Sequence, residues 1–192
     1  MTKRDEQKEK RRQEILLCSL DTFIKKGFAE TKIRDIANDL KISTGLFFHY
    51  FKSKESVYEE LINIAVEGAA DVLANDSLKP MELFEHITDN IFNSFAENSM
   101  SAKLFVFVIQ ALSNEVTQYK YKDILSKANN LNVTVPMIVK GQAEGTIKSG
   151  DPLALSIAFW GAIQGIAEIM AYMPESPCPK TSWIVDILRR KD

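Results

Sequence analysis

The sequence predicts an all-α protein, and three observations support this. Apolar residues recur through most of the chain at the i, i+3, i+4, i+7 spacing of helices with one buried face. The 192 residues include only eight Gly and six Pro, so few segments are interrupted. Apolar and polar residues rarely alternate, as they would in half-buried strands. With 45% hydrophobic residues, the chain can bury a substantial core in one or two compact units.

The first helix is expected over about residues 8–26, after a charged N-terminal stretch. Gly27 follows it and is a typical helix stop. The start of this helix is either an ordinary solvated end or a surface that faces phosphate, and the sequence leaves both open. The basic residues concerned, interleaved with acidic ones, are Lys8, Lys10, Arg11 and Arg12.

Two short helices follow within residues 31–51. Thr31 is placed to cap the first helix and Ser43 to cap the second. About three residues separate the helices, and the outward face of the second carries small, aromatic and basic groups. This arrangement predicts a helix-turn-helix. The residues expected to be buried are Ile33, Ile36, Ala37 and Leu40 in the first helix and Phe47, Tyr50 and Phe51 in the second.

The charge distribution is compatible with a nucleic-acid-binding head. The net charge of −2 alone argues against such a function. However, residues 1–54 contain 13 Lys and Arg and 8 Asp and Glu, a formal charge of +5, whereas the remainder carries −7. A basic head on an acidic body is expected if only the head meets phosphate.

Side-chain chemistry divides the candidate DNA contacts into two groups. Lys54, at the start of the next helix, is the main phosphate candidate, with Thr31 and Lys52 as lesser ones. Arg34 could pair with guanine, and Phe48 either touches a thymine methyl or sugar or packs against the domain. The full candidate set is Thr31, Arg34, Ser43, Thr44, Gly45, Leu46, Phe48, His49, Lys52 and Lys54.

The segment S-T-G-L-F-F-H-Y-F (residues 43–51) resembles the recognition-helix signature of the tetracycline-repressor (TetR) family of bacterial transcriptional regulators. The resemblance extends back to Arg12-Gln-Glu-Ile-Leu and forward to Lys54-Glu55, which is about the first third of the chain. Phe48 stands where the family usually has a tyrosine, so a phosphate contact through that hydroxyl is not expected. The resemblance implies a DNA-binding domain over residues 1–53 and a ligand-binding and dimerisation domain over residues 54–192, with a linking helix at about 54–74.

In the body, helices are expected at about residues 80–98, 102–112 and 152–172, and from Thr181 onward. The run at 102–112 could be a strand on its own, but no strand of similar quality is available to pair with it. A long helical segment is expected over about residues 116–145, bent where Pro136 frees a carbonyl. Asp151 and Pro152 form a strong helix start.

The segment 152–172 is apolar nearly all round, and a membrane span is the rival interpretation. Glu168 lies within it, and an acidic residue at mid-bilayer costs roughly 2.5–3.5 kcal/mol. A helix covered by its own core and by a second subunit fits better, and the family resemblance implies that the last two helices form a four-helix dimer interface. The alternative is that Trp183 packs only within its own chain. The interface candidates are Trp160, Gly161, Gly165, Glu168, Trp183, Ile184, Ile187 and Leu188.

The body is rich in aromatic residues, which either form the core or line a cavity for an apolar or aromatic ligand. The cavity candidates are Phe84, Phe92, Phe95, Phe105, Gln110, Met137, Trp160 and Gln164.

Catalytic and metal-binding motifs are missing from the sequence. It has two His, two widely separated Cys, no G-x-S-x-G, no phosphate-binding glycine loop and no H-E-x-x-H. No enzyme activity, cofactor or metal is therefore expected. Met1 is followed by charged residues rather than by an apolar signal segment, which favours the cytoplasm.

Together these features predict a homodimeric, ligand-responsive regulator that binds an inverted-repeat operator in double-stranded DNA, most simply as a repressor released by a small effector. An activator, or a regulator that responds to a partner protein, is an alternative within the same class. A cytosolic ligand carrier or adaptor that has lost DNA binding is the alternative from another class.

Overall fold

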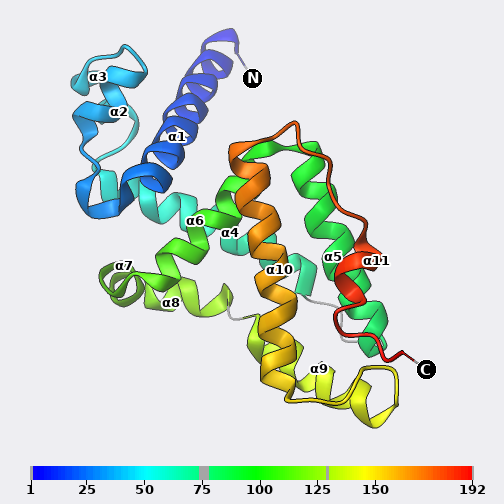
Figure 1. Cartoon of the computed structure of the whole chain (residues 1–192). Helices are drawn as coiled ribbons and strands as arrows, with labels where there is room; N and C mark the ends of the chain where they lie inside the picture. The colour runs from blue at the N-terminus through cyan, green and yellow to red at the C-terminus, as the bar shows by residue number, and fades with distance from the viewer. Residues whose placement is uncertain (1, 74–77, 129, 192) are drawn as a thin grey trace.

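A small helical head rests on a larger helical body (Figure 1). The computed structural model describes residues 2–73, 78–128 and 130–191, and within these ranges all elements are helical, which confirms the predicted fold class. In chain order they are α1 (Lys3–Glu30), α2 (Ile33–Asp39), α3 (Thr44–Tyr50), α4 (Lys54–Leu73), α5 (Pro80–Glu97), α6 (Ser99–Ser113), α7 (Glu115–Lys120), α8 (Lys122–Leu125), the 3₁₀ turn η1 (Ser126–Ala128), α9 (Leu131–Ala143), α10 (Pro152–Tyr172) and α11 (Thr181–Val185).

Helix α1 begins earlier than its apolar pattern predicts. Thr2 caps its start, because the Thr2 hydroxyl accepts from the Asp5 backbone N–H and the Asp5 carboxylate accepts from the Thr2 N–H at 3.0 Å. The regular helix breaks at the predicted Gly27, whose φ of +76° lies in the left-handed region that glycine tolerates. The following residues then turn the chain back toward α2.

One continuous hydrophobic core joins the head to the body. The C-terminal half of α1 packs against both α4 and α6. The Phe23 ring lies 5.0 Å from Tyr58 of α4 and 6.2 Å from Phe107 of α6, between ring centroids. Lys103 of α6 pairs with Asp21 of α1 at 2.7 Å. The two parts are therefore in firm contact through α1, as well as being linked by α4.

The expectation of one long helical segment over residues 116–145 is wrong. The Asn114 side chain caps α7, with Oδ1 accepting from Val116 N at 3.1 Å. Tyr121 then leaves helical geometry (φ −115°, ψ 25°) and buries its side chain, so that α7 and α8 are separate turns. Pro136 lies inside α9, the last of these helices. Burial of the Tyr121 ring, rather than the proline, accompanies the first break.

Helices α10 and α11 differ in how well the sequence predicts them. Asp151 caps α10 as expected, accepting from Ala154 N at 2.8 Å. Thr181 does not cap α11, which starts after Lys180, because its hydroxyl donates to the Asp89 carboxylate of α5. After Val185 the chain turns and pairs with the loop before α10, where Lys148 N donates to the Leu188 carbonyl at 3.0 Å. The final helix is thus shorter than its apolar stripe suggests.

Helix α10 is, within the described ranges, the only helix long and apolar enough to cross a membrane by length and composition. Its most apolar 18-residue window has a mean hydropathy of 1.6. Core helices of globular proteins pass the same test, so this property is weak evidence for a span. Packing of α10 against α6 and α9 accounts for its apolar character on one side.

Candidate nucleic-acid interface and body cavity

The turn between α2 and α3 sets the geometry of the helix-turn-helix. Lys41 adopts a φ of +55°, and the next residue, Ile42, donates its N–H to the Ala37 carbonyl at 2.9 Å. Ser43 caps α3 as predicted, its hydroxyl accepting from Leu46 N at 3.1 Å. Fully buried Ile36 and Phe47 hold α2 and α3 on the core. The outward residues of α3 are therefore presented on a short helix with fixed orientation.

Most of the candidate DNA contacts lie on the exposed side of this motif. The ring of Phe48 is 53% exposed and meets Phe47 edge-on at 5.9 Å, so it remains available to a partner and does not pack into the domain. The candidate residues that the structure leaves exposed are Arg34, Ser43, Thr44, Gly45, Leu46, Phe48, His49 and Lys52.

Thr31 does not have the position expected for it. It is buried, and its hydroxyl donates to the Gly27 carbonyl at 2.7 Å. It does not cap α2, because Lys32 is the residue that immediately precedes the helix. Both the capping role and the phosphate contact assigned to Thr31 are therefore incompatible with this structure.

Lys54 also does not have the role expected for it. Its ammonium donates to the carbonyls of Phe28 at 2.7 Å, Ala29 at 3.3 Å and Thr31 at 2.9 Å. It also lies 4.6 Å from the centroid of the Phe28 ring. These bonds use all three donors of a lysine, so none is left for phosphate. Lys54 instead fixes the connection between α1 and α2 to the start of α4.

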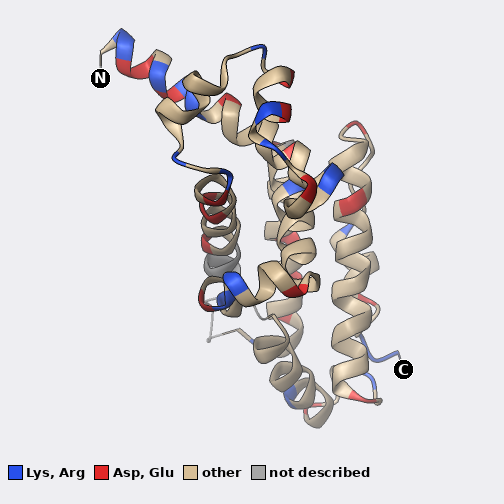
Figure 2. Ribbon diagram, turned by 90° about the vertical axis from the view of Figure 1, so that its left-hand side faces the viewer, with Lys and Arg blue, Asp and Glu red and all other residues tan. Residues whose placement is uncertain are grey.

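Several cations of the head are engaged within the protein. Arg12 pairs with Glu60 at 2.5 Å and lies 5.0 Å from the centroid of the Phe51 ring. Lys26 bonds Asp35 at 3.0 Å, which lowers the pKa of that carboxyl. Figure 2 shows basic residues along α1 and around the head.

Two further cations of the head were missed by sequence reasoning. Lys32 and Lys41 are exposed beside the motif and belong to none of the predicted contacts. Their position, directly before α2 and within the turn, was the signal that could have identified them. Both belong to the positive charge of the head surface around the helix-turn-helix.

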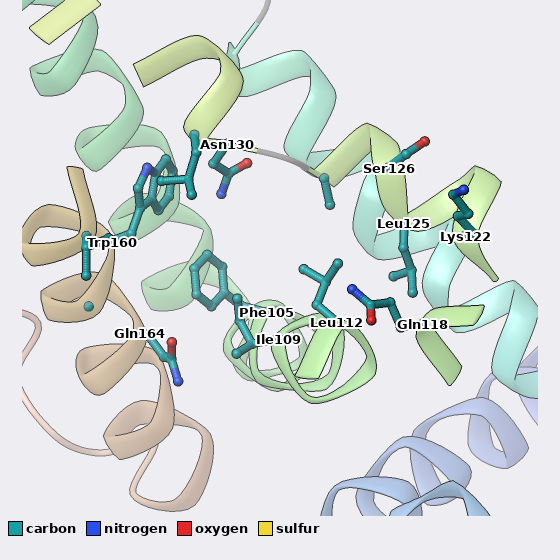
Figure 3. Close-up of a pocket in the computed structure, with 14 residues that line it drawn as sticks. Phe105, Ile109, Leu112, Gln118, Lys122, Leu125, Ser126, Asn130, Trp160 and Gln164 are labelled. Atoms are coloured by element: carbon teal, nitrogen blue, oxygen red, sulfur yellow. The ribbon is translucent and has the colours of Figure 1, made fainter. Parts of the chain in front are cut away.

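A cavity of about 550 Å³ lies in the body, between α6, the α7–η1 segment, α9 and α10 (Figure 3). Of the predicted lining residues, Phe105, Trp160 and Gln164 are present. Its lining residues are Phe105, Ile109, Leu112, Gln118, Lys122, Leu125, Ser126, Ala128, Asn130, Leu131, Ile157, Trp160, Gly161 and Gln164.

The other predicted cavity residues lie outside this lining, and packing explains several of them. Phe84 is fully buried against Phe159, with the ring centroids 5.0 Å apart, and Gln110 donates to the Ile24 carbonyl at 3.5 Å. The Phe95 ring meets the Phe105 ring edge-on, with the centroids 5.9 Å apart. The corrected residues are Phe84, Phe92, Phe95, Gln110 and Met137.

The body also exposes an apolar row along α10. The row repeats every four residues and therefore forms a ridge that is inclined to the helix axis. Leu153, Ile157 and Ile169 are 47%, 56% and 54% exposed. We call the exposed residues Leu153, Ile157, Gly161, Gly165, Ile169 and Met173 the α10 row.

The structure separates the candidate interface residues into two groups. Gly161, Gly165 and Glu168 are exposed on α10, and Trp183 of α11 is 64% exposed, so its own chain leaves most of this side chain uncovered. Ile184 and Leu188 are buried where α11 and the following turn pack, mainly against α5. These two residues are unavailable to a partner, which corrects that part of the expectation. Trp160 and Ile187 are partly buried.

Comparisons with known proteins agree with the helix-turn-helix geometry. Residues 15–61 match the family model described as "Bacterial regulatory proteins, tetR family". The HTH-type transcriptional repressor KstR2 of Mycolicibacterium smegmatis is 23% identical over 72% of this chain and 68% of its own length. The uncharacterized HTH-type transcriptional regulator YerO of Bacillus subtilis is 30% identical over 58% of this chain and 41% of its own length.

A solved structure extends the likeness to the whole fold. The MbdR regulator of Azoarcus sp. CIB superposes with a TM-score of 0.70, covering 91% of this chain and 95% of that one at 19% identity. These proteins are regulators of transcription and not enzymes. The family match falls on the helix-turn-helix, so residues 15–61 form a TetR-type DNA-binding motif, and the comparisons together support a transcriptional regulator of the TetR family.

Proposed function

We propose that this protein is a homodimeric repressor that binds an inverted-repeat operator and is released by a small molecule. The exposed face of α3 is the observation that carries the proposal. A capped helix presents Thr44, Leu46, Phe48 and His49 to solvent without internal polar partners among the described residues. Such a face suits the major groove, where a recognition helix reads base edges.

Residue chemistry suggests the division of contacts on this face. Arg34 is exposed on α2 and can pair bidentately with guanine. Thr44 and His49 can hydrogen-bond base edges, while Phe48 and Leu46 offer apolar contact to a thymine methyl. Gly45 and Ser43 allow the backbone to approach. Lys52, with the exposed Lys32 and Lys41, takes over the phosphate role that Lys54 cannot fill.

The α10 row supports dimerisation through the body. It is a contiguous apolar ridge, and a Cβ added at Gly161 or Gly165 would meet no atom of the chain within 4 Å other than the adjoining helix backbone. Two such helices could approach closely around a two-fold axis, which would place the same patch on both subunits. We assign residues 1–53 to DNA binding and residues 54–192 to dimerisation and ligand binding, in the cytoplasm.

A packed path from the cavity to the head supports the ligand response. Gln118 and Leu125 of the α7–α8 segment line the cavity. Between them in sequence, Tyr121 packs 5.3 Å from Tyr58 of α4 and 6.5 Å from Phe28, at the end of α1, between ring centroids. A ligand that moves this segment would shift the equilibrium between head positions, by as much as its affinities for the two forms differ.

Repression is favoured over activation by the relative from M. smegmatis, which is named a repressor. The carrier alternative has less support, because KstR2 and YerO are both named as regulators of transcription and Phe48 is exposed on the reading face. Regulation by a partner protein is the alternative that no observation favours.

The test is binding to the DNA upstream of the gene. We expect footprinting to protect an inverted repeat, with half-site centres about 34–36 Å apart or one further turn along. Affinity should fall steeply with salt, because each neutralised phosphate releases counterions with a slope of about −0.9. Absence of any protected repeat, or an affinity independent of salt, would contradict the proposal.

A further inference from the structure

The cavity of the body has an unequal distribution of charge. Its 14 lining residues include one cation, Lys122, and no Asp or Glu. The remaining polar groups are neutral, from Gln118, Ser126, Asn130 and Gln164. A cavity lined in this way favours a neutral or anionic guest over a cationic one. Its volume of about 550 Å³ falls within the roughly 300–1,000 Å³ of small-molecule sites.

The aromatic rings and the cation lie at different ends of the cavity. Figure 3 shows Trp160 and Phe105 on one side and Lys122 with Gln118 on the other. The Trp160 indole N–H already donates to the Thr134 hydroxyl at 3.2 Å, so the ring offers mainly carbon surface to a guest. The cavity therefore combines an aromatic end with a cationic end.

Among the polar groups of the lining, Lys122 and the Oδ1 atom of Asn130 are without a polar partner in the described structure. Lys122 is an exposed residue at the edge of the lining, and its side chain forms no ion pair among the described residues, whereas Lys120, two residues earlier, lies over the Phe28 and Tyr121 rings at 5.3 and 5.5 Å. The Oδ1 atom of Asn130 is buried and accepts no hydrogen bond. A buried acceptor of this kind is normally satisfied by a donor, and a ligand hydroxyl or a water carried with the ligand would supply one.

We propose that this cavity binds an amphipathic monocarboxylate. The apolar body of the ligand lies against Phe105 and Trp160, and its carboxylate pairs with Lys122 beside the Gln118 amide. This inference rests on the proposed function, which makes the cavity the effector site. It adds a negative charge to the requirement for an apolar or aromatic ligand.

Three probes with the same apolar tail separate the contribution of the charge to binding from that of the tail. They are dodecanoate, 1-dodecanol and dodecylamine. The chain has two Trp residues, so a Trp183→Phe protein reports through Trp160 alone. Fluorescence titration of this full-length protein gives each dissociation constant. We expect dodecanoate to bind at least about tenfold more tightly than the other two, because an ionic hydrogen bond exceeds a neutral one.

Variants of two lysines on the same segment show whether Lys122 causes the preference for dodecanoate. Lys122→Met should remove the preference for dodecanoate and leave dodecanol affinity unchanged, whereas Lys122→Arg should keep the preference. Lys127→Met is the matched control, because Lys127 is exposed on η1 and does not line the cavity. Equal affinity for dodecanoate and dodecanol, or failure of every probe to bind, overturns the inference.

Operator binding by the protein with Trp183 intact, measured with the same three probes, distinguishes this inference from the proposed function. If dodecanol binds and releases operator as well as dodecanoate does, the carboxylate requirement is wrong and the ligand-released repressor stands. If dodecanoate binds through Lys122 while the operator stays bound, the ligand class is correct and release by this ligand is wrong.

Discussion

Two surfaces of this protein expose large apolar side chains, and their surroundings assign them to different partners. On the head, Leu46 and Phe48 of α3 are exposed among the cations Arg34, Lys41 and Lys52. On the body, the α10 row is exposed on a helix whose 21 residues include a single charged residue, Glu168. Apolar groups within a basic field suit DNA, whereas an uncharged apolar row suits another protein surface. Exposure alone would not distinguish the two.

The largest expected effect comes from placing a charge in the α10 row. Ile169→Glu should weaken the dimer at least about 100-fold, because a two-fold interface would bury two unpaired carboxylates, each at a cost of several kcal/mol. Sedimentation equilibrium measures the dissociation constant, and operator affinity should fall with it. Val139→Glu on α9 is the matched control, because Val139 is 51% exposed and lies outside the row. Equal effects of the two substitutions would show that the row is not the interface.

The next effect concerns Lys54, whose ammonium bonds three backbone carbonyls of the head. Lys54→Met should lower the free energy of unfolding by about 2–3 kcal/mol, because carbonyl acceptors lose a charged donor. Chemical denaturation measures this loss. Lys52→Met, two residues away and exposed, should leave stability unchanged and reduce the salt slope of DNA binding by about one. If Lys54→Met shows the Lys52 pattern instead, Lys54 contacts phosphate and the structural role is wrong.

The head was more accessible to sequence reasoning than the body, because its signals are local. A hydroxyl one residue before a helix identified the Ser43 cap, and a four-residue period identified Phe47 as buried. Both depend on neighbours a few residues away. Lys54 was misassigned because its acceptors lie 23 to 26 residues earlier in the chain, at Phe28 and Thr31 among them.

In the body, composition predicted the kind of residue but not its surroundings. Phe84 and Phe105 are both aromatic residues on apolar helices, yet Phe84 packs against Phe159 and Phe105 lines the cavity. That difference depends on which helices meet, and helical periodicity carries no such information. Ile184 shows the same limit, since an apolar stripe can face its own chain as readily as a partner.

A third prediction tests the contact between the head and the body. Burial raises the pKa of Tyr58 to about 12 from 10, although a hydrogen bond with Thr117 opposes the shift. The raised pKa means that folding favours the neutral phenol. The associated stability is intact below pH 10 and is lost as the pH rises toward 12, by up to about 2–3 kcal/mol.

Tyr58→Phe isolates this contribution, because other groups also titrate at alkaline pH. Denaturation curves of the two proteins at pH 8 and pH 11.5 give the comparison, and the variant should lose less stability between them. Tyr119→Phe is the control, because Tyr119 on α7 is 87% exposed. If Tyr58→Phe loses as much stability between the two pH values as the wild type does, the phenol is hydrated and the contact between the head and the body is open to water.

The smallest effect distinguishes reading of bases from attraction to phosphate on the head surface. Arg34→Ala should weaken operator binding about tenfold, within the roughly 1–3 kcal/mol of one bidentate base contact. Its influence should fall on a single base pair in each half-site, and the salt slope should stay close to that of the wild type. A slope reduced by about 0.9, with equal losses on every sequence, would instead assign Arg34 to phosphate. Lys148→Ala is the control for general charge, since Lys148 lies in the loop before α10. If Lys148→Ala weakens operator binding as much as Arg34→Ala does, general positive charge and not the helix-turn-helix governs binding. The head surface would then have no special affinity for DNA, and the contrast with the α10 row would be wrong.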